Sequence, residues 1–163
     1  MKFSICIPVY NGDKFIKKAI ESVLSQTYTD WELIIYNNGS LDKTSEIINS
    51  YDDARLRIYE EGEIVSEAIP AWNKSMSYST GDYVLMLGVD DWFHNNFLEE
   101  SYQILVNNNF DLLTGHTDAY DLDFNFIEMI TAASVINKLD KKNKENELIS
   151  FLGKDFINAF VKD

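Results

Sequence analysis

Residues 81–92, GDYVLMLGVDDW, combine the pattern of a buried strand with two adjacent carboxylates. The apolar run from Tyr83 to Leu87 has the length and the glycine flank of a strand that is buried on both faces. Asp90 and Asp91 therefore emerge where this strand ends, and ligands of open α/β sheets bind at that end of the strands. We interpret the stretch as a central strand that delivers two acidic side chains to a binding site.

The acidic pair allows two interpretations. Neighbouring carboxylates repel each other, so a site that keeps both ionised usually supplies a cation or a hydrogen-bonding ligand. Oxygen ligands suit Mg²⁺ or Mn²⁺, which keep several waters and bridge to substrate phosphates. The same residues also suit an acidic turn that caps a helix beginning near Asn95, since Asp is a preferred N-cap and turn residue. On these residues alone, both interpretations stay open.

Composition limits the class of protein. The chain has 163 residues, 45% of them apolar, which is enough to fill the core of one globular domain. Its 14 Lys and Arg against 27 Asp and Glu give a net charge of −13, which argues against nucleic acid as a partner. The one cysteine, Cys6, favours a reducing compartment. The apolar run at residues 3–9 is too short for a membrane span, so we expect a cytoplasmic protein.

Strand-like and helix-like patterns alternate along the first two-thirds of the chain, which is typical of βαβ units around a parallel sheet. We predict strands at residues 3–9, 31–36, 55–59, 83–87 and 111–114, helices at 16–24, 42–51, 69–78 and 97–106, and a strand or hairpin at 120–129 that extends the sheet. The predicted fold class is α/β, with a Rossmann-like, mainly parallel sheet flanked by helices.

The C-terminal part gives a weaker pattern. Residues 151–161 alternate apolar clusters with polar residues, as an amphipathic helix would. Packing against the domain is the favoured use of this helix, and a membrane or partner surface is the alternative. We therefore divide the chain into an α/β domain at residues 1–130 and a helical extension at residues 131–163, which would be a truncated part of the same domain.

An ordered set of motifs resembles family 2 glycosyltransferases, which are inverting enzymes that use nucleotide sugars on an A-type α/β fold. The resemblance covers residues 2–99. It is carried by SICIPVYN at 4–11, AIESVLSQTY at 19–28, WELII at 31–35, AWNK at 71–74, GDY at 81–83 and LGVDDW at 87–92. The resemblance implies a nucleotide-diphospho-sugar transferase fold.

The resemblance also implies roles for particular residues. The nucleotide-sugar site would be lined by Pro8, Val9, Tyr10, Asn11, Asn38, Asn73 and Asp90. Within this set, Asp90 would accept a hydrogen bond from the ribose or the sugar. Asp91 would hold a divalent cation, Mn²⁺ or Mg²⁺, on the diphosphate. The cation would stabilise the negative charge that develops on the leaving nucleoside diphosphate.

Two departures from the family pattern bear on function. The family usually carries at least one Asp where this chain has Asn37 and Asn38, so a charge-assisted contact to the base is replaced by an amide that both donates and accepts. No general base is recognisable, although inverting transfer needs one. Asp118, Asp121 and Asp123 follow a predicted strand, but we assign none of them this role.

The implied function is transfer of a sugar, from a UDP-sugar by preference, to a saccharide or lipid-linked acceptor in cell-surface polysaccharide synthesis. Such an enzyme would be cytoplasmic, and peripheral attachment at the inner face of the membrane is compatible with it. The alternative is a truncated or non-catalytic nucleotide-sugar-binding or interaction module, which the amide pair and the unassigned base motivate.

Overall fold

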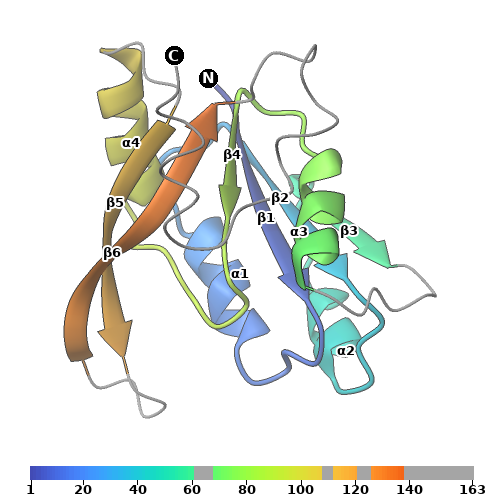
Figure 1. Ribbon diagram of the computed structural model, residues 1–163. Helices are drawn as coiled ribbons and strands as arrows, with labels where there is room; N and C mark the ends of the chain where they lie inside the picture. Colours follow the sequence, from blue (N-terminus) through green and yellow to red (C-terminus); the bar gives the residue numbers. More distant parts are fainter. Residues whose placement is uncertain (61–67, 108–111, 121–125, 138–163) are drawn as a thin grey trace.

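The computed structural model describes residues 1–60, 68–107, 112–120 and 126–137, and shows a sheet with helices on both faces (Figure 1). The strands are β1 (Phe3–Val9), β2 (Trp31–Asn37), β3 (Leu56–Glu60), β4 (Tyr83–Met86), β5 (Leu112–Tyr120) and β6 (Phe126–Asn137). The helices are α1 (Ile16–Leu24), α2 (Thr44–Ile48), α3 (Ala68–Ser77) and α4 (Phe97–Val106). Strands and helices alternate up to α4, as predicted.

The strand order is β3-β2-β1-β4-β6-β5. Strands β3, β2, β1 and β4 are parallel, whereas β6 runs antiparallel to both β4 and β5. The prediction of an α/β fold with a mainly parallel sheet is confirmed. The chain moves outward from β1 to β3 and then returns to place β4 on the other side of β1. The carboxyl ends of β1 and β4 therefore flank a topological switch point, where ligands of such sheets bind.

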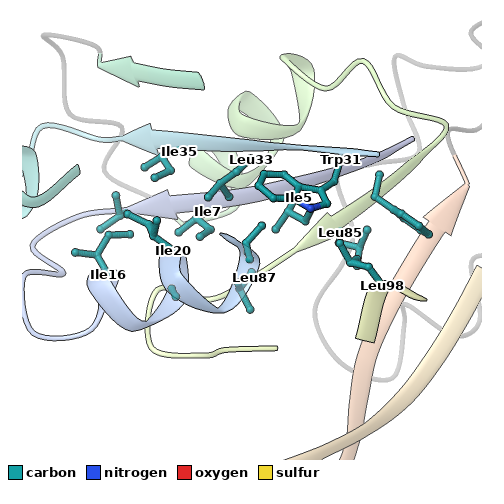
Figure 2. Packing of buried hydrophobic residues seen from close by; sticks show 14 of the residues in the cluster. Ile5, Ile7, Ile16, Ile20, Trp31, Leu33, Ile35, Leu85, Leu87 and Leu98 are labelled. Atoms are coloured by element: carbon teal, nitrogen blue, oxygen red, sulfur yellow. The ribbon is translucent and has the colours of Figure 1, made fainter. Parts of the chain in front are cut away.

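Alternation along β1 assigns its residues to two layers. Phe3, Ile5 and Ile7 face the main core, where they join apolar side chains of α1 and α4. Figure 2 shows Ile7 near the Ile20 side chain of α1, and Ile5 near Trp31 and Leu85 in the same cluster. On the opposite face, the Cys6 thiol donates to the Ser75 carbonyl of α3 at 3.7 Å, so α3 covers that side. All seven residues of β2 are buried, as expected of a strand covered on both faces.

Three predicted segments differ from the structure. The strand predicted at residues 111–114 continues to Tyr120 as β5, because it pairs with β6 along this length. Helix α2 spans Thr44–Ile48 and is shorter than the predicted 42–51, because Asp42 stays outside the helix and accepts a hydrogen bond from the Thr44 amide. Strand β6 continues to Asn137, because pairing with β4 and β5 holds it extended. The division at residue 130 therefore falls inside a strand, and residues 131–137 are not helical. Residues 138–163, which include the predicted amphipathic helix, lie outside the described residues.

The edge of the sheet where β1, β2 and β4 begin holds a buried carboxylate. Glu32 accepts hydrogen bonds from the Ser4 hydroxyl at 2.6 Å, the Thr80 amide at 2.6 Å, Lys2 Nζ at 3.0 Å and Arg57 Nη1 at 3.1 Å. Desolvation alone would raise the pKa of Glu32, but the hydrogen bonds from Ser4, Thr80 and Lys2 outweigh it and lower the pKa to about 2. The protein thus supplies all the partners that this charge needs.

None of the helices in the described ranges is both long and apolar enough to cross a bilayer.

Candidate functional site

The acidic pair lies on a tight turn just beyond β4, at the switch point. The Asp91 amide donates to the Gly88 carbonyl at 3.1 Å, which closes the turn, and both Asp90 and Asp91 are exposed. A Cβ atom on Gly88 would lie 2.6 Å from Asp91 Oδ2 and 3.1 Å from Asp90 Oδ1. The two carboxylates therefore converge over Gly88, and only glycine leaves the space between them open.

The surroundings of this pair disfavour two negative charges. Desolvation and then the charge of Asp90 raise the pKa of the Asp91 carboxyl, and a hydrogen bond with the Gly88 backbone offsets part of the shift. A cation between the two side chains would reverse this balance. Among the described residues, no three His, Cys, Asp or Glu side chains gather as a complete ligand set. The pair is suited to Mg²⁺ or Mn²⁺, which bind through one or two carboxylates and take their other ligands from water and phosphates.

The acidic turn packs directly on the loop that follows β1. A Cβ atom on Gly12 would lie 2.6 Å from Val89 Cγ2 and 2.7 Å from Val9 Cγ2. Glycine at position 12 is therefore required for Val89 to approach the β1 loop this closely. The contact joins the two loops on either side of the switch point and holds the acidic turn against the end of β1.

Three consecutive backbone amides of the β1 loop are already engaged. Asn11 donates to Ser40 Oγ at 2.9 Å, Gly12 to Thr44 Oγ1 at 2.8 Å, and Asp13 to Asp42 Oδ2 at 3.1 Å. Asn11 has a φ of 53°, and its own side chain accepts from the Leu41 amide at 2.8 Å. The loop after β1 is thus held along its length by the segment after β2.

The two amides at the end of β2 have different roles. Asn37 Nδ2 donates to Ser45 Oγ at 2.7 Å and to Glu60 Oε1 at 3.0 Å, and Asn37 Oδ1 accepts from the Ser40 amide at 3.1 Å. Its side chain therefore ties the loop to α2 and β3. The backbone amide of Asn38 donates to the Val9 carbonyl at 2.9 Å, which places Asn38 beside the end of β1.

The structure brings most of the predicted site residues to one edge of the sheet. Val9, Asn11, Asn38 and the acidic turn are joined by the contacts above, Tyr10 is 47% exposed beside them, and Pro8 is half-buried. Asn73 is the outlier, because it lies half-exposed on α3 and its side chain makes no hydrogen bond with the other described residues. Asp118 lies on β5, and Asp121 and Asp123 fall outside the described residues.

Sequence reasoning did not find the residues that hold the acidic segment in place. Gly12 belongs to a turn in the sequence, but its close contact with Val89 joins residues far apart in the chain. In the sequence, Lys18, Ser22 and Gln26 belong only to a predicted helix or a motif, yet they contact the segment after Asp91. Their four-residue spacing is the one signal that could have singled them out.

Comparison with known proteins identifies the family. The sequence profile of glycosyl transferase family 2 matches residues 4–159, so the chain belongs to this family. It is 32% identical over 113 residues to the UDP-Glc:α-D-GlcNAc-diphosphoundecaprenol β-1,3-glucosyltransferase WfgD of Escherichia coli, a match that covers 69% of this chain and 44% of that protein.

Two solved structures have the same fold. The S. aureus TarS 1–349 fragment in complex with UDP-GlcNAc superposes with a TM-score of 0.66 at 23% identity, covering 69% of this chain and 33% of the other. The mannosyltransferase PcManGT from Pyrobaculum calidifontis, in complex with GDP-Man and Mn²⁺, superposes with a TM-score of 0.60 at 20% identity, covering 68% and 34%. This chain thus spans less than half the length of the proteins compared here.

Proposed function

We propose that this chain binds a nucleotide-diphosphate sugar, which is the donor substrate of a glycosyltransferase reaction. In this proposal Asp91 binds a Mn²⁺ or Mg²⁺ ion and Asp90 contacts the donor. The observation that carries it is the convergence of both carboxylates over Gly88 at the switch point of the sheet. Bound there, the cation would stabilise the charge that develops on the leaving diphosphate.

The backbone amides of the β1 loop already have hydrogen-bond partners, and this supports the proposal that a cation binds the diphosphate. Many nucleotide-binding folds cradle phosphates with free backbone amides at a loop or a helix N-terminus. Here the amides of Asn11, Gly12 and Asp13 already donate to side chains of the next loop. A diphosphate at this edge would need its charge balanced in another way, and a cation on the acidic pair provides it.

The nucleoside would lie along the ends of β1 and β2. Pro8, Val9, Tyr10 and Asn11 would form one side of its pocket, and Asn38 would face the base. Asn38 would contact the base because its backbone places it beside the end of β1, whereas the Asn37 side chain ties the loop to α2 and β3. Asn73 would contact the nucleotide or the sugar from α3.

We favour a UDP-sugar as donor and a saccharide or lipid-linked acceptor. TarS was solved with UDP-GlcNAc, and the WfgD name specifies UDP-Glc and a diphosphoundecaprenol acceptor. The corresponding role is cell-surface polysaccharide synthesis by a cytoplasmic protein, with attachment at the inner face of the membrane where a lipid-linked acceptor would be presented.

Titration calorimetry against UDP, GDP and dTDP, each with Mn²⁺ and with EDTA, tests the proposal. We expect one nucleotide, UDP by preference, to bind more tightly with Mn²⁺ than with EDTA. If no nucleotide binds under either condition, the donor-binding role is wrong and the non-catalytic interaction module becomes the better account. If a nucleotide binds equally well in EDTA, the assignment of Asp91 to a cation is wrong.

A further inference from the structure

A row of three side chains on and just beyond α1 contacts the segment that follows the acidic pair. Lys18, Ser22 and Gln26 are spaced four residues apart, so Lys18 and Ser22 share one side of α1 and Gln26 continues the row past its end at Leu24. Ser22 and Gln26 are buried, with 8% and 6% of their surface exposed. Buried polar side chains need hydrogen-bond partners, and Ser22 and Gln26 find theirs partly in α1 and partly in the segment that follows Asp91.

The row meets three consecutive residues of that segment in order. Lys18 Nζ lies 3.2 Å from the centroid of the Trp92 ring, a cation–π contact directly after Asp91. The Phe93 amide donates to Ser22 Oγ at 3.2 Å. Gln26 Nε2 donates to the His94 carbonyl at 2.6 Å. The row therefore fixes the Trp92 ring and the backbone of Phe93 and His94 in one register along α1.

Gln26 also secures the start of α4. The first turn of a helix has amides without intrahelical partners, and the N-cap residue Asn96 provides no side-chain cap here. Gln26 Oε1 accepts from the Leu98 amide at 2.9 Å and takes that role from outside the helix. One side chain thus holds both ends of the stretch from His94 to Leu98.

The Ser22 hydroxyl is oriented to accept. Its proton goes to the Ala19 carbonyl at 2.7 Å, which leaves the oxygen lone pairs for the Phe93 amide. On the other side of the acidic pair, Val89 packs against Gly12. The turn that carries Asp90 and Asp91 is therefore held before and after the carboxylates by separate contacts.

We propose that Lys18, Ser22 and Gln26 are positioning residues that set the location of the Asp90–Asp91 turn and thereby its affinity for a divalent cation with nucleotide. The contacts above reach the ring of Trp92 and the backbone of Phe93 and His94, so the three residues act through residues 92–94. This inference rests on the proposed function of the acidic pair. Residues that orient metal ligands from outside typically change metal affinity by about 10- to 100-fold when they are replaced.

The test compares Gln26→Ala with Gln103→Ala, and Lys18→Met with Lys17→Met. Gln103 and Lys17 are exposed and contact Glu99 and Glu21 on their own helices, so they are matched controls away from the row. Calorimetry gives the ratio of the UDP dissociation constants in EDTA and in Mn²⁺, which isolates the contribution of the cation. We expect Gln26→Ala to lower this ratio about tenfold, Lys18→Met to lower it less, and both controls to keep it.

A purely structural role would give a different result. If Gln26→Ala only loosened the fold, UDP affinity in EDTA and in Mn²⁺ would fall together and the ratio would stay at the wild-type value, which would overturn the proposal. Should Gln26→Ala not fold, Lys18→Met decides, because Lys18 is half-exposed and its replacement leaves the core intact. A wild-type chain whose ratio is near one would overturn the proposed function, and this inference with it.

Discussion

Two carboxylates at opposite ends of the same sheet have opposite surroundings. Glu32, where β2 begins, is buried among donor groups from four residues, and its pKa is lowered to about 2. Asp91, beyond the end of β4, is an exposed residue whose carboxyl is nonetheless partly buried, and this desolvation and then the Asp90 charge raise its pKa. The charge of Glu32 is stabilised by hydrogen bonds from the chain itself, whereas the charge of Asp91 is destabilised by its surroundings.

This difference distinguishes a carboxylate that stabilises the fold from one that is available to bind a ligand. A carboxylate that accepts several hydrogen bonds strengthens the fold and has little capacity left for a ligand. A carboxylate that faces another negative charge weakens the fold slightly until a cation joins the two. We expect replacement of Glu32 to change stability without changing ligand binding, and replacement of Asp91 to do the reverse.

The largest expected effect is on UDP and cation binding at Asp90 and Asp91. Asp91→Asn should weaken Mn²⁺-dependent UDP binding by at least about 100-fold, since loss of a direct ligand exceeds loss of an outer partner. The midpoint of thermal unfolding in EDTA should not fall, because the cost of desolvating this charge and its repulsion from Asp90 are both removed. Calorimetry and thermal unfolding measure the two effects. The exposed Asp52→Asn is the matched control, and an Asp91→Asn chain that binds UDP like this control contradicts the assignment.

The next effect is on stability at the opposite end. Glu32→Gln should lower the free energy of unfolding by about 2 kcal/mol, because hydrogen bonds to a charged acceptor are lost and the remaining groups are imperfectly paired. Urea unfolding measures this change, with the exposed Glu46→Gln as control. The ratio of UDP affinities in EDTA and Mn²⁺ should match that of the wild type. A changed ratio would mean that the two ends are not independent.

Acid should remove the contribution of Glu32. Its folded-state pKa of about 2 lies below the ordinary value of 4.5, so the unfolded chain takes up this proton more readily. The stabilisation is fully present above about pH 4.5 and is lost as the pH falls toward 2. Urea unfolding from pH 7 to 2 should therefore show the wild-type and Glu32→Gln curves converging. Curves that stay parallel would exclude a lowered pKa at Glu32.

The smallest expected effect concerns Asn37 at the end of β2, in the loop where family 2 glycosyltransferases usually carry an Asp. Asn37→Asp should destabilise the fold by about 1 kcal/mol, because it removes the donor to Glu60 Oε1 and puts two carboxylates together. Glu60→Gln should restore part of the loss in the double variant, and urea unfolding of the four chains measures this coupling. Equal losses with and without Glu60→Gln would show that the two side chains do not interact.

The sequence predicted the parts of this molecule that depend on local patterns. The strand before Asp90 and Asp91 was evident from its apolar run, and the alternation of strands and helices led to the correct fold class. Strand β6 was harder, because TAAS at residues 131–134 is not a typical strand pattern and its conformation depends on pairing with β4 and β5.

The features that hold the site together were not predictable in the same way. The Gln26 hydrogen bond to Leu98 joins residues 72 positions apart, and the close approach of Val89 to Gly12 depends on the strand order. Asn37 was grouped with Asn38 as a base contact, and only the tertiary structure shows that its side chain is committed to Ser45 and Glu60. Apart from the four-residue spacing of Lys18, Ser22 and Gln26, such contacts between distant segments leave no periodic signal in the sequence.

The most direct test locates the cation by NMR. In the ¹⁵N-labelled chain with UDP, replacing Mg²⁺ by paramagnetic Mn²⁺ broadens the amide signals nearest to the ion. We predict the strongest broadening at residues 88–92, weaker broadening at 11–13, and none at Glu32 or Thr80, where the charge is already satisfied. Broadening that is centred elsewhere, or spread evenly over the surface of the protein, would contradict the claim that a metal ion binds at Asp90 and Asp91 beyond the end of β4.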